Sequence, residues 1–170
     1  MGATDISYTE VIFRSRQRQQ LSDDASNLNA QSMRNNLVFS GIEEDNSSGS
    51  EPPTVTERKL RAHLHQKMKI TKETVEALRL ERVHRMPSQP VVGKVRYIVA
   101  RFTFFKDRKM VRQQWPRLKG TNYFVNEQFP PEVQTKRVCL FPKMKAARRE
   151  GKRAWVSYDT LYVDGRAVRD

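Results

Sequence analysis

The chain has 170 residues and a net charge of +13, because 32 Lys and Arg outnumber 19 Asp and Glu. No apolar run approaches the ~18 residues that a membrane-spanning helix requires, and the N-terminus lacks the apolar segment of a secretory signal. The single cysteine, Cys139, excludes an intramolecular disulfide and a cysteine-rich zinc module. The composition favours an intracellular protein with one ordinary domain or two small ones.

The basic residues are concentrated in two segments. Residues 79–119 carry 12 basic and 2 acidic side chains, and residues 131–170 have a net charge of +5. Residues 120–130, between them, have a net charge of −1. Two basic segments around a near-neutral one are typical of a protein that binds a polyanion such as nucleic acid. A basic surface that only keeps the protein soluble is the alternative.

Residues 1–33 are polar and weakly patterned. Leu21, Ala25, Leu28 and Ser32 are spaced by four, three and four residues. This makes one heptad seam, whereas a coiled coil requires three or four heptads. We interpret the segment as a polar tail, helical or disordered, or as the remnant of a coiled coil.

Residues 34–129 contain alternating strand and helix patterns. An acidic loop, EEDNSSGSEPP, follows the first strand and is expected to be solvated. Thr54 and Glu57 stand at capping-box spacing before the first helix, and Pro116 ends the second. The expected strands are residues 36–42, 77–83, 96–104 and 123–126, and the expected helices are residues 55–69 and 105–115.

This order predicts an α+β protein with the ferredoxin-like βαββαβ topology of RNA-recognition-motif domains, in which two helices cover one face of a four-stranded antiparallel sheet. In the strand KVRYIVARFTF, alternation directs Ile98, Ala100 and Phe102 to the core. The same alternation directs Tyr97 and Arg101 to the open face, which binds single-stranded nucleic acid in such domains.

The RNA-binding sequence pattern of the third strand is incomplete. The stretch VRYIVARF keeps Tyr97 but has Val99 where an aromatic ring is expected, and Val38 occupies the stacking position of the first strand. With at most one stacking ring, the arginines must supply most of the binding, through phosphate contacts and guanidinium stacking. The pattern predicts salt-dependent binding with low sequence specificity.

Residues 130–170 predict a small basic α/β element. A helical pattern is interrupted at Pro142, resumes up to Glu150 and stops at Gly151, and an alternating segment with the turn dipeptide Asp164-Gly165 follows. Catalysis has weak support in the chain. His63 and His65 stand two residues apart on one helix, so they cannot share a face as metal ligands. We expect no enzymatic activity, no metal and no cofactor.

The stretches MRNNLVFSGIEE, YIVARFTFFKDRKMV, LKGTNYFVNEQFPPEV and KRVCLFPKMKAARREGKRAWVSYDTLYVDG resemble the first-open-reading-frame protein of LINE-type retrotransposons. The resemblance covers about residues 33–164. It implies an atypical RNA-recognition motif at residues 34–129 and a C-terminal domain at residues 130–170. It also implies trimers, packaging of the element's RNA into ribonucleoprotein particles and nucleic-acid chaperone activity. The family's long coiled coil is missing here, and the C-terminal domain ends early.

The partners expected from the resemblance are single-stranded RNA and DNA, with self-association, in a cytoplasmic ribonucleoprotein; nuclear access stays open. Matching positions imply contacts at Arg34, Asn36, Lys136, Arg137 and Tyr158, and less surely at four strand arginines. A degenerate domain that binds proteins is the alternative function. The candidate nucleic-acid contacts are Arg34, Asn36, Arg82, Arg85, Arg96, Tyr97, Arg101, Lys136, Arg137, Arg148, Arg149 and Tyr158.

Overall fold

The computed structural model describes residues 8–169, and residues 1–7 of the predicted tail lie outside this range. The protein is α+β, with helices and antiparallel sheets, as the sequence predicts. It divides into two compact units, one of residues 33–128 and one of residues 1–32 with 129–170. The sequence places the corresponding divisions after residues 33 and 129.

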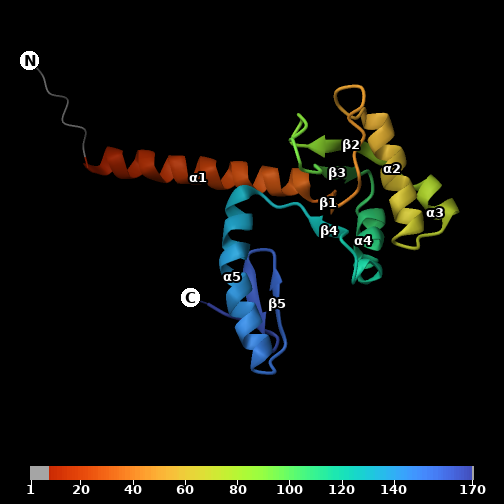
Figure 1. Cartoon of the computed structure of the whole chain (residues 1–170). Helices are drawn as coiled ribbons and strands as arrows, with labels where there is room; N and C mark the ends of the chain where they lie inside the picture. Colours follow the sequence, from red (N-terminus) through yellow and green to blue (C-terminus); the bar gives the residue numbers. More distant parts are fainter. Residues whose placement is uncertain (1–7, 170) are drawn as a thin grey trace, which may run out of the picture. The chain divides into compact units, whose positions relative to one another are not determined.

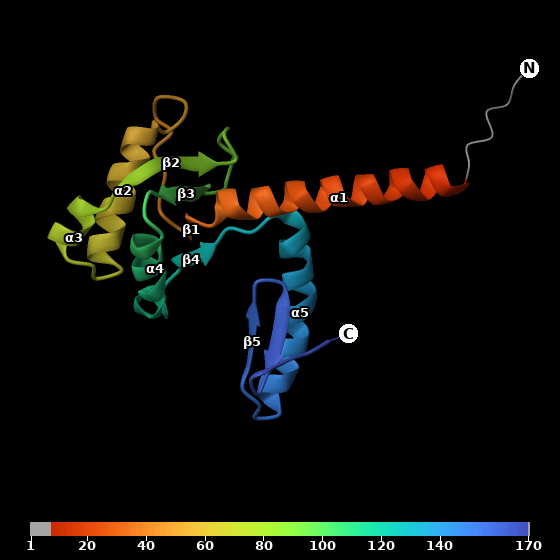
Figure 2. The same cartoon turned by 180° about the vertical axis from the view of Figure 1, so that it is seen from behind.

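Residues 33–128 form a four-stranded antiparallel sheet with helices on one face. The strands lie in the order β2-β3-β1-β4. Figures 1 and 2 show α2 and α4 on the same side of this sheet. The elements, in chain order, are β1 (Asn36–Ser40), α2 (Pro53–Gln66), α3 (Lys72–Ala77), β2 (Leu80–Met86), β3 (Tyr97–Phe102), α4 (Phe105–Gln113), a 3-10 turn η1 (Trp115–Leu118) and β4 (Phe124–Glu127).

The core follows from strand alternation. Leu37 and Phe39 of β1 and Ile98, Ala100 and Phe102 of β3 are fully buried. They pack against apolar side chains of α2 and α4, such as Leu60, Leu64 and Val111. Gly41 directly follows the last residue of β1 and has a left-handed φ of +92°. A side chain there would collide with the backbone carbonyl of Asn122, so only glycine fits.

Three local predictions in this unit are wrong. The short helix α3, capped by the Thr71 hydroxyl, occupies residues that the sequence assigns partly to the second strand, so β2 begins at Leu80 instead of residue 77. The helix α2 begins at Pro53, two residues before the prediction, because proline is well suited to the first turn. The acidic loop is not simply solvated, because Glu51 is buried and Glu44 nearly so.

His63 of α2 is a buried histidine in this core. Its ring makes edge contacts with Phe39 and Tyr123, at centroid distances of 6.3 and 4.9 Å. Its Nε2 is buried and has no hydrogen-bond partner among the described residues. Burial, assisted by the nearby charge of Lys67, lowers the pKa of His63 from 6.5 to about 4. The folded protein therefore holds this imidazole neutral.

Acidification should destabilise the fold through His63. Because its folded pKa lies below its unfolded one, the stabilising contribution is complete above pH 6.5 and is lost as the pH falls from 6.5 towards 4. Between pH 7 and pH 5, the free energy of unfolding should fall by about 1–2 kcal/mol more in the parent than in His63→Leu, which cannot titrate. Urea unfolding at both pH values measures this difference. Equal pH dependence of the two proteins would exclude His63 as the source.

The other unit contains α1 (Tyr8–Met33), α5 (Pro131–Arg149), β5 (Ala154–Ser157), β6 (Thr160–Val163) and β7 (Arg166–Ala167). The helix α1 buries none of its residues, so residues 8–33 form a solvent-exposed helix, one of the alternatives that the sequence leaves open. Figure 2 shows β5 beside α5. The three strands form an antiparallel sheet, with the predicted turn at Asp164 and Gly165. The predicted interruption at Pro142 is wrong. The helix α5 continues through it, although proline has no N–H to donate to the preceding turn.

Candidate nucleic-acid interface

The sheet face opposite α2 and α4 carries a row of polar and basic side chains. Across the strands, Arg82 of β2 pairs with Arg101 of β3, which pairs with Asn36 of β1. These residues alternate with the buried core positions, so they share the open face. Arg82 and Arg101 are exposed, and the Arg101 Nε forms an ion pair with Glu81 Oε2 at 2.9 Å. Because this ion pair is half exposed, a phosphate can compete with Glu81 for Arg101.

Two exposed aromatic rings lie in another row of the same face. Tyr97 of β3 is 54% exposed and Phe124 of β4 is 58% exposed. Phe124 of β4 pairs with Ser40 of β1. On the other side of β1, Phe39 pairs with Ile98, so the antiparallel register places Tyr97 opposite Ser40. The two rings therefore flank Ser40. Sheet spacing places their backbones about 10 Å apart. Single-stranded nucleic acid stacks its bases on rings arranged in this way.

Arg34, two residues before β1, and Asn36, the first residue of β1, each have a defined partner. The Arg34 guanidinium lies over the ring of Phe105, 4.4 Å from its centroid. The Asn36 amide donates to Gln128 Oε1 at 2.8 Å, while its own side-chain oxygen is buried without a hydrogen-bond partner among the described residues. Both side chains are thus held in place before any ligand binds.

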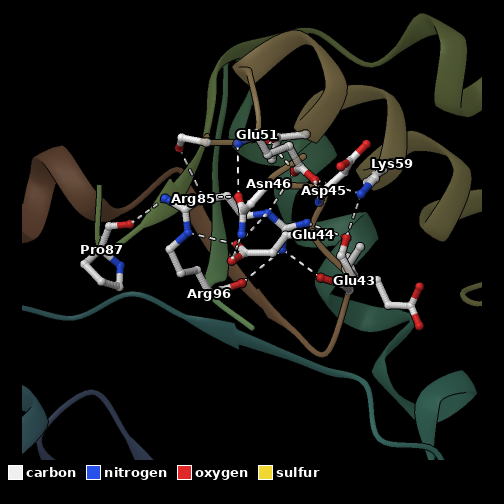
Figure 3. Close-up of polar contacts among 12 residues, drawn as sticks. Glu43, Glu44, Asp45, Asn46, Glu51, Lys59, Arg85, Pro87 and Arg96 are labelled. Carbon is white, nitrogen blue, oxygen red and sulfur yellow. Dashed lines mark hydrogen bonds and ion pairs between the residues drawn. The ribbon is translucent and has the colours of Figure 1, made fainter. Parts of the chain in front are cut away.

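Arg85 and Arg96, which the sequence analysis counts among the nucleic-acid contacts, are buried in an ion-pair network (Figure 3). Arg85 donates from Nε to Glu51 at 2.9 Å and from its Nη atoms to the carbonyl oxygens of Ile42 and Glu43, at 2.7 Å each. Arg96 donates from Nε to Glu44 at 2.8 Å. Since their donors are occupied by protein acceptors, we leave both arginines out of the candidate interface.

Glu51 is the most buried acid of this network. It accepts hydrogen bonds from Lys59, Arg85, the Thr56 hydroxyl and the backbone N–H of Asp45, at 2.7 to 2.9 Å. Burial raises the pKa of Glu51, but these hydrogen bonds, led by the one from Lys59, outweigh burial and bring the pKa to about 2. The loop of residues 43–51 is therefore fixed to β2 by charge, and it does not offer a free acidic cluster.

The C-terminal candidates lie mostly against their own β-sheet. Arg137 donates to the carbonyl of Tyr158 at 2.6 Å, and its guanidinium lies over Phe129, 4.2 Å from the ring centroid. Arg148 donates to the carbonyl of Ala154 at 2.8 Å, and Lys136 lies 3.5 Å from the Asp159 carboxylate. The interactions of Arg137 and Arg148 attach the β5–β6 hairpin to α5.

Tyr158 and Arg149 remain open to solvent in this unit. Tyr158, at a left-handed φ of 52°, packs its ring edge-on against Phe129 while the side chain stays largely exposed. Arg149 and Lys145 are exposed on α5. These side chains give the unit a basic surface with one accessible ring.

Phe124 is not among the contacts that the sequence predicts, although its neighbours carry a signal for it. Its neighbour Val125 is buried, so alternation sends Phe124 and Asn126 to the open face of an edge strand. The same parity argument places Arg85 with the buried Val83, away from Arg82. Arg96 shares its parity with the buried Ile98 and Ala100, so alternation along the predicted strand of residues 96–104 also pointed to its burial.

Within residues 8–169, no helix combines the length and the apolar character that crossing a membrane requires. No three His, Cys, Asp or Glu side chains in the same range are grouped so that they could hold a metal ion. In comparisons with known proteins, no family model matches the chain, and no curated protein matches it significantly.

Proposed function

We propose that the protein binds single-stranded RNA and DNA with low sequence specificity, through a divergent RNA-recognition-motif domain of ferredoxin-like topology. The observation that carries the proposal is the open sheet face, where Arg82, Arg101 and Asn36 form one row and Tyr97 and Phe124 another. Guanidinium groups suit phosphates, and exposed rings suit unpaired bases. The strong net charge adds long-range attraction to any polyanion.

The composition of this face favours weak specificity. Every base has a π-face, so stacking on Tyr97 and Phe124 does not select a sequence. Phosphate contacts of Arg82 and Arg101 carry no sequence information either. The main source of affinity is therefore the release of counterions, which makes binding sensitive to salt.

The resemblance to LINE first-open-reading-frame proteins supports a larger role, in which the protein packages element RNA into ribonucleoprotein particles and acts as a nucleic-acid chaperone without catalysis. A chaperone must screen repulsion between strands while each contact stays exchangeable. Dispersed arginines and few stacking rings meet this requirement. The helix α1 exposes Leu21 and Leu28 seven residues apart, so self-association through this helix stays part of the proposal.

Salt dependence tests the proposal directly. The affinity for a fluorescein-labelled single-stranded 30-mer, measured by anisotropy from 50 to 300 mM KCl, should fall with a log–log slope of about −0.7 per phosphate contact. Tyr97→Ala should weaken binding by about 1–3 kcal/mol if the ring stacks on a base. Val92→Ala, at an exposed position in the β2–β3 loop, is the matched control. A duplex of the same sequence reports the preference for single strands.

A slope near zero would overturn nucleic-acid binding and favour the alternative, a protein-interaction module. One feature of the structure favours that alternative. It is a pocket of about 350 Å³ between α2 and α3, lined by Ala62, Val75 and the charged side chains around them. Unchanged affinity in folded Tyr97→Ala would instead show that the sheet face is not the binding surface.

A further inference from the structure

A second candidate site lies at the free edge of the four-stranded sheet. A pocket of about 210 Å³ is formed by the end of α4, the turn η1 and the edge strand β4. Three aromatic residues line it: Trp115, which is 45% exposed, Phe124, which also belongs to the open face, and Tyr123, whose ring contacts His63. The Lys119 ammonium lies over the Trp115 ring, 4.8 Å from its centroid. The pocket therefore combines flat apolar surfaces with a cation.

Arg112 adds an unused hydrogen-bonding group to this pocket. Its Nε is buried and has no hydrogen-bond partner among the described residues. The nearby acid that could pair with it, Glu127, accepts from Arg108 at 2.7 Å instead. A buried guanidinium nitrogen without an acceptor is costly, so a ligand that brings an oxygen acceptor would be stabilised here.

We infer that this pocket holds one nucleotide of the bound single strand, with its base against Trp115 and Phe124 and its phosphate beside Lys119. The inference rests on the proposed function and extends it to a defined subsite. Arg112 supplies the donor for an oxygen of the base or phosphate. The edge strand β4 leaves one row of its backbone N–H and C=O groups without a strand partner, and these groups face outward for base recognition.

The expected path of a bound single strand over the sheet favours a nucleotide as the occupant of the pocket. Phe124 belongs both to the row with Tyr97 on the open face and to the pocket at the edge. A strand stacked on Tyr97 and Phe124 can continue over β4 without a break. The segment of residues 105–119, which forms one wall, has six basic and one acidic side chain. An acidic peptide would also be attracted, but it has no flat group to use the two rings.

Trp115 fluorescence tests the inference in the full chain. The variant Trp155→Phe leaves Trp115 as the only tryptophan and alters a ring in the other unit, where Trp155 stacks on Tyr162. An unlabelled mixed-sequence single-stranded 20-mer RNA should quench the Trp115 emission as it saturates. The same RNA carrying 5-iodouridine should crosslink on irradiation to Trp115 or Phe124, as mass spectrometry of the digested complex would show.

Variants measure the contribution of the pocket, with anisotropy of the fluorescein-labelled 20-mer as the readout. Trp115→Ala and Arg112→Gln should each weaken binding about 5- to 150-fold, and Trp115→Phe should retain most of the affinity. Lys119→Ala should weaken it less, and Lys109→Ala, which changes an exposed lysine of α4 outside the pocket, is its control. Thermal unfolding identifies any variant that fails to fold, in which case the quenching and crosslinking of the parent decide.

Each outcome separates the two proposals. Binding by anisotropy without quenching or crosslinking of Trp115 and Phe124 overturns the subsite and leaves the proposed function standing. No binding of any single strand overturns both. If hexaglutamate quenches the Trp115 emission and RNA does not, the inference of a nucleotide subsite is wrong, and the pocket binds an acidic peptide.

Discussion

Glu51→Gln is expected to lower the free energy of unfolding by about 3–5 kcal/mol, the cost typical of removing one partner from a buried ion pair. Glutamine keeps the shape of the side chain but removes the charge that compensates Arg85 and Lys59. The remaining acid, Glu44, lies 3.9 Å from Arg85 and already accepts from Arg96. An uncompensated guanidinium would therefore stay buried. Urea unfolding followed by far-UV circular dichroism at pH 7 measures the loss.

Glu57→Gln is the matched control, because Glu57 lies on α2 in a partly exposed pair with Arg61 at 3.6 Å. Its loss should stay below about 0.5 kcal/mol. A loss below about 1 kcal/mol in Glu51→Gln would show that the network contributes little to stability. The pH dependence gives a second criterion. Since the folded pKa of Glu51 is about 2 and its ordinary value is 4.5, its contribution is present above pH 4.5 and is lost as the pH falls towards 2. Glu51→Gln should lack this part of the acid sensitivity.

A chain ending at Phe129 is expected to fold but to bind a single-stranded 30-mer about 10- to 100-fold more weakly at 0.15 M salt, because each lost phosphate contact removes counterion release. Residues 33–128 form a compact unit with their own core, so the truncation removes no part of the four-stranded sheet. It removes ten basic side chains, among them Arg149, and the exposed ring of Tyr158. The log–log salt slope should become less negative by about 2 to 4.

Lys145→Gln with Arg149→Gln in the full chain is the control that separates charge from fold. Both side chains are exposed on α5, so their neutralisation should leave the unit folded and reproduce part of the loss. Equal affinity of the truncated and full chains would remove the C-terminal unit from the interface. Loss in the truncated chain without any loss in the double variant would assign its contribution to Tyr158 and the hairpin instead of the charges on α5.

The sequence predicted correctly which side chains of a strand are buried where apolar residues alternate with polar ones. The β3 residues Ile98, Ala100 and Phe102 lie in the core as alternation predicts, and Tyr97 and Arg101 are exposed. It was uninformative about the partner of a buried charge. Alternation separates Arg85 from Arg82, but it does not show that Arg85 meets Glu51, which stands 34 residues earlier. No local pattern reveals an ion pair over that separation.

The prediction of a helix break was wrong for a related reason, because contacts distant in the sequence decide it. Pro142 predicts a break from its missing N–H and its ring, yet α5 continues because packing against the hairpin holds both of its halves. Arg137 and Arg148, which resemble nucleic-acid contacts in a basic run, supply two of the attachments. A basic run in the sequence therefore mixes side chains that hold the fold with side chains that remain for a ligand.

The buried position of the Arg85–Glu51 pair has a practical consequence for handling the protein. Mobile ions screen charges that are exposed to water but reach buried pairs poorly, and the side chains of this pair are at most 2% exposed. Molar salt should consequently strip copurified cellular nucleic acid from the surface arginines while the fold stays intact. A high-salt wash during purification would then yield protein ready for quantitative titration, without a cycle of denaturation and refolding.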